Sequence, residues 1–291
     1  MKSAIGSAGG LQVGRIPYIN CYPVYGGIDR GIVPLRGALV NGVPTALNRL
    51  MADGALDVSV VSAVEYARDA KRYLLLPELA ITSDGPVRSV MLFSRLAPSA
   101  LGGRRVLVSR SSMTSVALLE LLFEHVWRCR PEFVPGDAEL VDVARFEDEH
   151  HDARLVIGDA ALRLFDDAGR GGPWATRYPH RVDLGGAWKD WTGLPFVFAV
   201  WVAQRATPVH EALSAHASLI ASRDWGLQHL DVLAEQASVA SGVSKAGCLE
   251  YFAGLDYRLS YPHLAGLTEF FRRLVLAGRV PDGSLAFLPA A

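Results

Sequence analysis

The chain has few cysteines, and their spacing fits no cysteine-dependent site. The 291 residues include three, Cys21, Cys129 and Cys248, which are an odd number, far apart and without a CxxC pair. A disulfide scaffold or a structural zinc site needs paired or closely spaced cysteines. Disulfide-stabilised secreted proteins are therefore excluded, and we expect a protein of the reducing cytoplasm. Cys21 is interpreted as a buried, small apolar residue rather than a nucleophile.

Long apolar runs are also missing. Polar residues or prolines interrupt every hydrophobic stretch well short of the ~20 residues that a membrane span needs. Residues 1–10 contain one lysine and are small and glycine-rich, where a signal peptide would need an apolar segment. We therefore expect neither a membrane partner nor a secretion signal.

Clustered positive charge and the common nucleotide and hydrolase motifs are absent as well. The 29 Lys and Arg residues are interspersed with 30 Asp and Glu residues, with a net charge of −1, which argues against nucleic-acid binding. There is no glycine-rich loop followed by lysine and no GxSxG elbow. His150 and His151 lie in an acidic run, where adjacent histidines are typical of a solvated surface turn rather than a metal site. We expect no metal and no cofactor.

The sequence does contain a stretch, residues 104–127, in which a short strand leads through a hydroxyl-rich turn into a long helix. Leu107 and Val108 are typical of a buried strand, and the apolar residues from 116 to 127 predict a largely buried helix. The first turn of a helix has backbone N–H groups without intrahelical partners, so the turn is a candidate seat for a carboxylate. The alternative is ordinary N-capping by one hydroxyl, from Ser112 or Thr114. The hydroxyl side chains of the turn are Ser111, Ser112, Thr114 and Ser115.

The order strand, polar loop, helix, strand, capped helix occurs twice, in residues 11–66 and 104–164. The loop 18–21 of the first copy corresponds to the hydroxyl turn of the second, and the N-terminal cap Ser62 corresponds to Asp159. Alternating strands and helices predict parallel sheets, which bind ligands at the carboxyl ends of their strands. We therefore expect an α/β protein of two lobes, each a central, mostly parallel sheet flanked by helices, with a ligand cleft between the lobes.

The expected lobes are built from three segments of the chain. Residues 1–94 and 203–291 would form lobe I, and residues 95–202 would form lobe II. The apolar strands near Phe93 and Phe198 would then be the two crossings between the lobes. The alternative is one continuous sheet without a cleft.

Polar residues at the expected cleft are the candidates for ligand contacts. Tyr18 and Asn20 lie in the aromatic loop after the first strand, and Ser89 interrupts an apolar strand. Asp159 follows Gly158 at the end of a strand, where it either caps the next helix or faces the cleft. Hydroxyl, amide and helix N-terminal donors turned into a cleft are typical of a site for a small organic anion.

Six motifs in consistent order, spread over residues 11 to 280, resemble the chorismate dehydratase family of the futalosine route to menaquinone. The resemblance implies a fold similar to type II periplasmic binding proteins. The motifs are GRIPYINCYP at 14–23, VP at 43–44 with LDV at 56–58 and SAVEYA at 62–67, SVMLFS at 89–94, TSVALL at 114–119, IGDAAL at 157–162 and TGLPFVFA at 192–199.

The resemblance also implies a reaction. Chorismate would lose the ring C3 proton and the C4 hydroxyl to give 3-[(1-carboxyvinyl)oxy]benzoate. The new ring is aromatic, so the enzyme need supply only modest acid or base help. In the family, the enolpyruvyl carboxylate of the substrate itself is proposed to take the proton. Asn20 matches the asparagine of the family's N-terminal loop and is the predicted catalytic residue, which would orient the reacting centre.

The other predicted site residues are expected to bind chorismate, chiefly through its two carboxylates. Two alternatives stay open: an enzyme of the same pathway like 1,4-dihydroxy-6-naphthoate synthase, which relies on a histidine base, and a cytoplasmic small-anion-binding protein without catalysis. No histidine lies in a motif expected to face the cleft, which favours the dehydratase. The predicted substrate-binding residues are Tyr18, Ser62, Ser89, Ser111, Ser112, Thr114, Ser115, Gly158 and Asp159.

Overall fold

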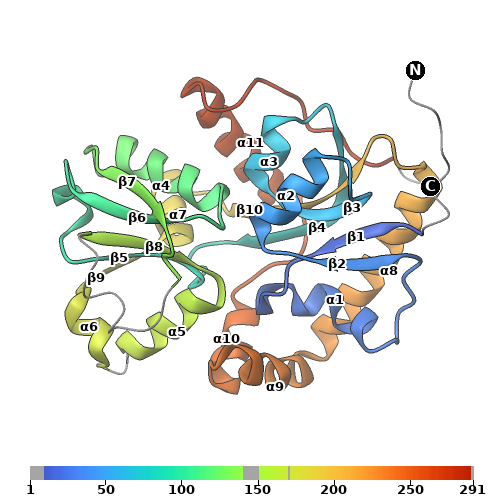
Figure 1. Ribbon diagram of the computed structural model, residues 1–291, viewed down its shortest axis with the longest axis horizontal. Coiled ribbons are helices and arrows are strands. Elements are labelled where there is room, and N and C mark those ends of the chain that lie inside the picture. The colour runs from blue at the N-terminus through green and yellow to red at the C-terminus, as the bar shows by residue number, and fades with distance from the viewer. Residues whose placement is uncertain (1–9, 140–150, 170, 290–291) are drawn as a thin grey trace.

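The computed structural model describes residues 10–139, 151–169 and 171–289 and places them in two lobes that lie side by side (Figure 1). Each lobe contains one five-stranded sheet with helices on both faces. Within these ranges, no helix is long and apolar enough to cross a membrane.

The first sheet combines strands from the beginning of the chain with one strand that follows the second lobe. β1 is parallel to both of its neighbours, whereas β10 is antiparallel to both of its neighbours. In register, Val200 of β10 lies opposite Val61 and Ala80. In spatial order the strands are β2 (Ala38–Asn41), β1 (Gln12–Arg15), β3 (Val58–Ser62), β10 (Phe196–Gln204) and β4 (Tyr73–Ser83).

The second sheet repeats this arrangement with a continuous part of the chain. β6 is parallel to both of its neighbours, and β5 is antiparallel to both of its neighbours. The strands in order are β7 (Glu132–Gly136), β6 (Arg105–Ser109), β8 (Ala153–Ile157), β5 (Val90–Ser94) and β9 (His180–Asp183).

The predicted two-lobed α/β architecture is confirmed, and in each mixed sheet four of the five strands run in the same direction. The chain enters each sheet from the other lobe through β5 or β10, and these two strands run against their neighbours. The predicted limits placed residues 90–94 in lobe I, but they pair in the second sheet. The same limits placed residues 196–202 in lobe II, but they pair in the first sheet. An apolar run predicts a buried strand but does not identify its partners. Apart from these two strands, the lobe limits stay a prediction.

Helices cover both faces of each sheet (Figure 1). In the first lobe, α1 and α8 pack together on the face that also carries α9 and α10, and α2, α3 and α11 cover the other. In the second lobe, α4 and α7 pack together on one face, with α5 and α6 on the other. The bounds in the first lobe are α1 (Tyr22–Asp29), α2 (Pro44–Ala52), α3 (Ala63–Arg68), α8 (Val209–Gln228), α9 (Leu230–Ser241), α10 (Lys245–Ala253) and α11 (Tyr261–Leu276). Those in the second lobe are α4 (Thr114–His125), α5 (Gly158–Gly169), α6 (Pro173–Arg177) and α7 (Leu184–Thr192), and short 3-10 helices η1 (Ile19–Cys21) and η2 (Pro98–Ala100) complete the fold.

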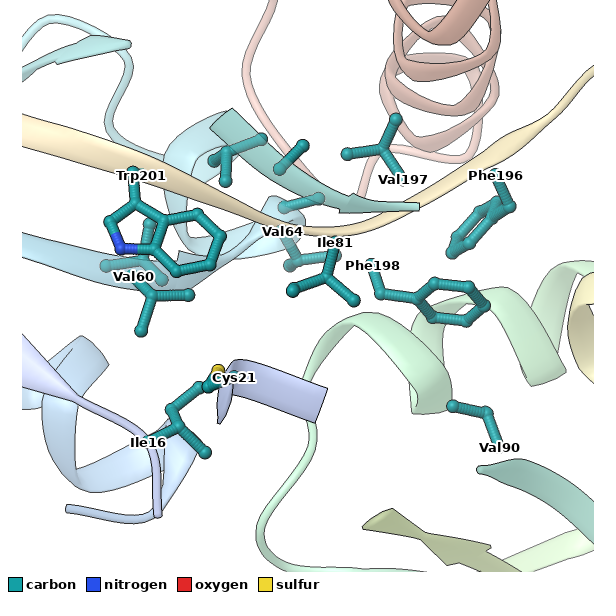
Figure 2. Close-up of a cluster of buried hydrophobic side chains, with 14 of the residues drawn as sticks. Ile16, Cys21, Val60, Val64, Ile81, Val90, Phe196, Val197, Phe198 and Trp201 are labelled. Atoms are coloured by element: carbon teal, nitrogen blue, oxygen red, sulfur yellow. The ribbon is translucent and has the colours of Figure 1, made fainter. Parts of the chain in front are cut away.

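The hydrophobic core follows from the covered sheets. β3 and β8 are buried along their whole length, as expected for strands that have helices on both faces. The Trp201 indole donates to the Tyr25 hydroxyl at 3.0 Å, and that hydroxyl donates to the backbone oxygen of Gly14 at 2.9 Å, so the polar atoms of this cluster are satisfied. Figure 2 shows Trp201 among the buried side chains of the first lobe. It also shows that Phe198 of β10 lies nearer to Val90 of β5 than Trp201 does.

Candidate active site

A cavity of about 70 Å³ lies between the two lobes. Strands β1, β3, β6 and β8 end beside it, as expected for the carboxyl edges of the parallel strands. The structure brings all the predicted site residues to its wall except Ser111 and Asp159. The polar side chains of the wall are those of Tyr18, Asn20, Ser62, Ser89, Ser112, Thr114 and Ser115, and Gly158 also lines it.

The rest of the wall is apolar. Ile16, Ile81 and Phe198 come from the first lobe and Val90 comes from the second, and Figure 2 shows all four. Pockets for small organic ligands usually measure ~300–1,000 Å³, so this cavity is smaller than the usual site for such a ligand.

Asn20 carries the most unusual polar atom of the site. It lies in η1, and its side-chain oxygen Oδ1 is buried without a hydrogen-bond partner among the described residues. An amide oxygen can accept two hydrogen bonds, and leaving one buried and unpaired costs about 1–3 kcal/mol. Because Asn20 lines the cavity, this oxygen is placed to accept a hydrogen bond from a hydroxyl or N–H donor there.

Asp159 supports the Asn20 loop from the other lobe. Its carboxylate accepts a hydrogen bond from the backbone N–H of Ile19 at 3.2 Å. Burial raises the pKa of Asp159 to about 6, while the bond from Ile19 lowers it. Asp159 lies in the first turn of α5, and its bond with Ile19 crosses between the lobes. A direct contact between Asp159 and substrate stays a prediction.

Tyr18 and Gly158 pack against each other across the same boundary. Gly158 has a φ of +64°, and a Cβ atom added there would lie 3.2 Å from the Tyr18 ring. Both the backbone conformation and the ring contact therefore require glycine. Burial raises the pKa of the Tyr18 phenol to about 12, while the nearby Ser111 side chain lowers it. Ser111 does not line the cavity.

The hydroxyl turn before α4 combines capping with contacts to the opposite lobe. The Ser112 hydroxyl accepts from the backbone N–H of Ser115 at 3.2 Å, as the capping alternative predicted. The Thr114 hydroxyl instead accepts from the backbone N–H of Val64, also at 3.2 Å, which belongs to α3 of the first lobe. The turn therefore closes against the first lobe while Ser112, Thr114 and Ser115 all line the cavity.

Ser62 is fixed by a residue that the sequence did not predict. The Asn48 amide nitrogen donates to the Ser62 hydroxyl at 2.9 Å, and the Asn48 amide oxygen accepts from the Ser62 backbone N–H at 3.1 Å. Asn48 lies on the buried face of α2 between Leu47 and Met51. A polar residue in an otherwise apolar helix face could have predicted this contact, because a buried amide needs hydrogen-bond partners. As predicted, Ser62 caps α3 by accepting from the N–H of Glu65 at 3.3 Å.

The cavity wall is electrically neutral. Within the described part of the chain, no Lys, Arg, His, Asp or Glu lines it, and no three His, Cys, Asp or Glu side chains are grouped as a metal site would need. Carboxylates of a ligand would therefore be held by hydroxyls, amides and backbone N–H groups. His150 lies outside the described residues. The prediction of a solvated turn is wrong for His151, which is buried, bonds to the Tyr178 hydroxyl at 2.9 Å and has a pKa lowered by burial to about 4.

Comparison with known proteins identifies the family. A family model described as menaquinone biosynthesis matches residues 11–275. The chain belongs to the menaquinone biosynthesis family. A relative named chorismate dehydratase, from Thermus thermophilus, is 32% identical over 274 residues, which cover 89% of this chain and 96% of the relative. A second chorismate dehydratase, from Campylobacter jejuni, is 28% identical over 192 residues, 64% of each chain.

Solved structures confirm the predicted fold of this family member, which is that of type II periplasmic binding proteins. Protein AF1704 from Archaeoglobus fulgidus superposes with a TM-score of 0.74 at 20% identity, covering 93% of this chain and 98% of that one. The alkanesulfonate-binding protein SsuA from Xanthomonas axonopodis pv. citri, bound to MOPS, gives a TM-score of 0.65 at 12% identity over 95% of this chain and 96% of that one. At these identities the likeness establishes the fold alone.

Proposed function

We propose that this member of the menaquinone biosynthesis family is a chorismate dehydratase, which converts chorismate to 3-[(1-carboxyvinyl)oxy]benzoate and water. The observation that carries the proposal is the Asn20 oxygen, which has no partner in the described part of the chain and belongs to a neutral cavity lined by hydroxyls. The two relatives named chorismate dehydratase support it. A cytoplasmic location remains part of the proposal.

The composition of the wall suits the two ends of the substrate. Chorismate carries two carboxylates, an ether-linked enolpyruvyl group and a ring with one hydroxyl. The Ser112 to Ser115 turn of the second lobe provides donors for one carboxylate, and Ser89 at the crossing provides a donor for another oxygen. The apolar side chains Ile81 and Phe198 would face the carbon skeleton. A substrate held from both lobes is oriented at the reacting C3 and C4 atoms.

The proton balance requires no external reagent. One C–H bond at C3 and one C–O bond at C4 break, a ring double bond forms, and the proton and hydroxide leave together as water. The described cavity wall has no side chain that titrates near neutrality, and the nearby Asp159 carboxylate is directed at the Ile19 N–H. As the family resemblance implies, we propose that the enolpyruvyl carboxylate of the substrate takes the proton and that Asn20 holds the reacting centre by hydrogen bonds.

The test is direct. Purified protein is incubated with chorismate without added metal or nucleotide, and the products are separated by liquid chromatography with mass detection. The expected product is lighter than chorismate by one water and has the ultraviolet spectrum of a substituted benzoate. Conversion at the rate of a protein-free control would refute the proposal. Tight binding of chorismate without conversion would instead support the small-anion-binding alternative.

The naphthoate synthase-like alternative is less well supported by the site. That reading needs a histidine base, and no histidine lines the cavity in the described ranges. His151 bonds to Tyr178 and has its pKa lowered to about 4 by burial. The dehydratase therefore remains the better match.

A further inference from the structure

Ser89 is a cavity residue whose backbone and side chain are both held by hydrogen bonds. It lies just before β5 at a crossing between the lobes, and 4% of its surface is exposed. Its N–H donates to the oxygen of Val87 and its carbonyl accepts from the N–H of Gly158, both at 2.8 Å. The N–H groups of Val87 and Arg88 bind the buried carboxylate of Asp183. The backbone of Ser89 is therefore fixed from both sides.

The hydroxyl of Ser89 is held by α10 of the first lobe. The phenol of Tyr251 donates to the Ser89 oxygen at 2.8 Å, across 162 positions of sequence. The Tyr251 side chain is 2% exposed, and burial raises its pKa far above the ordinary value, so that the phenol keeps its proton. Arg88, which precedes Ser89, forms an ion pair with Glu250, which precedes Tyr251. This ion pair is a second connection between α10 and the segment before β5.

The direction of this hydrogen bond decides what Ser89 can do. A serine hydroxyl has one proton to donate and two acceptor positions. Tyr251 occupies an acceptor position, so the Ser89 proton is directed away from the phenol, and Ser89 lines the cavity. We propose that Tyr251 is a positioning residue, which fixes the Ser89 O–H as a hydrogen-bond donor to an oxygen of the substrate. This role rests on the proposed dehydratase function.

Tyr251→Phe removes the phenol and keeps the ring. Loss of one orienting hydrogen bond should lower kcat/KM for chorismate by about 5- to 20-fold, mainly through kcat. Ser89→Ala removes the donor itself and should lower kcat/KM by about 100-fold. In the double variant, Tyr251→Phe should have no further effect, because the hydroxyl that it orients is gone. Effects of the two substitutions that multiply, or a Tyr251→Phe variant with full activity, would overturn the proposal.

Tyr257 provides a matched control. It is also a buried tyrosine, 1% exposed, but its hydroxyl has no hydrogen-bond partner among the described residues. Tyr257→Phe should therefore keep kcat and KM, and a loss equal to that of Tyr251→Phe would point to general packing and count against the role of Tyr251. If the wild-type protein itself leaves chorismate unchanged, the dehydratase function fails, and the role of Tyr251 fails with it.

A second measurement tests the hydrogen bond even if the Tyr251→Phe variant folds poorly. With 3-fluorotyrosine at position 251, both the ring and the hydroxyl remain, and turnover should stay within about 3-fold of wild type because the donor is retained. Its ¹⁹F signal should shift when Ser89 is replaced by Ala. An unchanged signal would show that the two hydroxyls are not bonded in solution and would overturn the proposal.

Discussion

Replacing Asn20 should separate catalysis from stability. The Asn20 oxygen is buried and unpaired among the described residues. Asn20→Ala removes an atom that costs the fold about 1–3 kcal/mol and also removes some side-chain contacts. These effects have opposite signs, so we expect the free energy of unfolding to change by less than about 1 kcal/mol, or to rise.

Turnover should respond very differently. If the amide holds the reacting centre, its loss should lower kcat by about 100- to 1,000-fold and change KM much less. The assay follows the aromatic product under initial-rate conditions, with chorismate binding measured separately by calorimetry. Unfolding in urea gives the free energy for the same preparations.

Asn48 is the matched control for this experiment. It is an asparagine that contacts the cavity residue Ser62, and its side-chain hydrogen bonds are to Ser62 and to the Met113 sulfur. Asn48→Ala leaves the N–H of Ser62 unpaired and should cost about 2–3 kcal/mol of stability. An Asn20→Ala variant that loses as much stability as Asn48→Ala, or that keeps wild-type turnover, would refute the assignment of Asn20 to the ligand.

Three further outcomes follow from the contacts between the lobes. Burial raises the pKa of Asp159 to about 6, so the stability that this group contributes is lost as pH rises from about 4 to about 6. Relative to Asp159→Asn, the free energy of unfolding of the wild type should fall by about 1–2 kcal/mol across that window. Parallel urea-unfolding profiles of the two proteins would contradict this. Gly158→Ala should cost more stability and activity than Gly54→Ala, because both glycines have positive φ but only Gly158 has neighbouring atoms within 4 Å; equal thermal shifts would argue against the ring contact. Thr114→Val removes the acceptor of the Val64 N–H, which weakens the contact between the lobes. KM should rise by about 5- to 10-fold, and the radius of gyration measured by X-ray scattering should increase. An unchanged radius and KM would exclude a role of Thr114 in holding the lobes together.

The parts of the site that lie within one strand, turn and helix could be predicted from sequence. The turn containing Ser112 and Thr114 and the strand end at Gly158 are local patterns, and their positions at the carboxyl ends of strands follow from the fold class. The residues that fix these groups were not predicted. Asn48 reaches Ser62 from another element, and Tyr251 reaches Ser89 across 162 positions. Periodicity describes which face of an element is buried and does not specify its distant partners.

The same limit explains the errors in the fold. The buried runs of β5 and β10 were recognised, but their direction and sheet depend on pairing with strands far away in sequence. His151 lies in a charged run, and its burial against Tyr178 follows from tertiary packing. Local composition predicted an exposed turn there, and tertiary contacts overrode it.

The position of β10 has a consequence for synthesis of the chain. β3 and β4 are consecutive strands, yet β10 lies between them. A nascent chain that ends before Phe196 therefore leaves β3 and β4 without the strand that joins them, and unpaired strand edges favour pairing with other chains. All five strands of the second sheet, by contrast, precede β10 in the sequence. The lobe that the ribosome begins first is thus the lobe whose sheet is completed last.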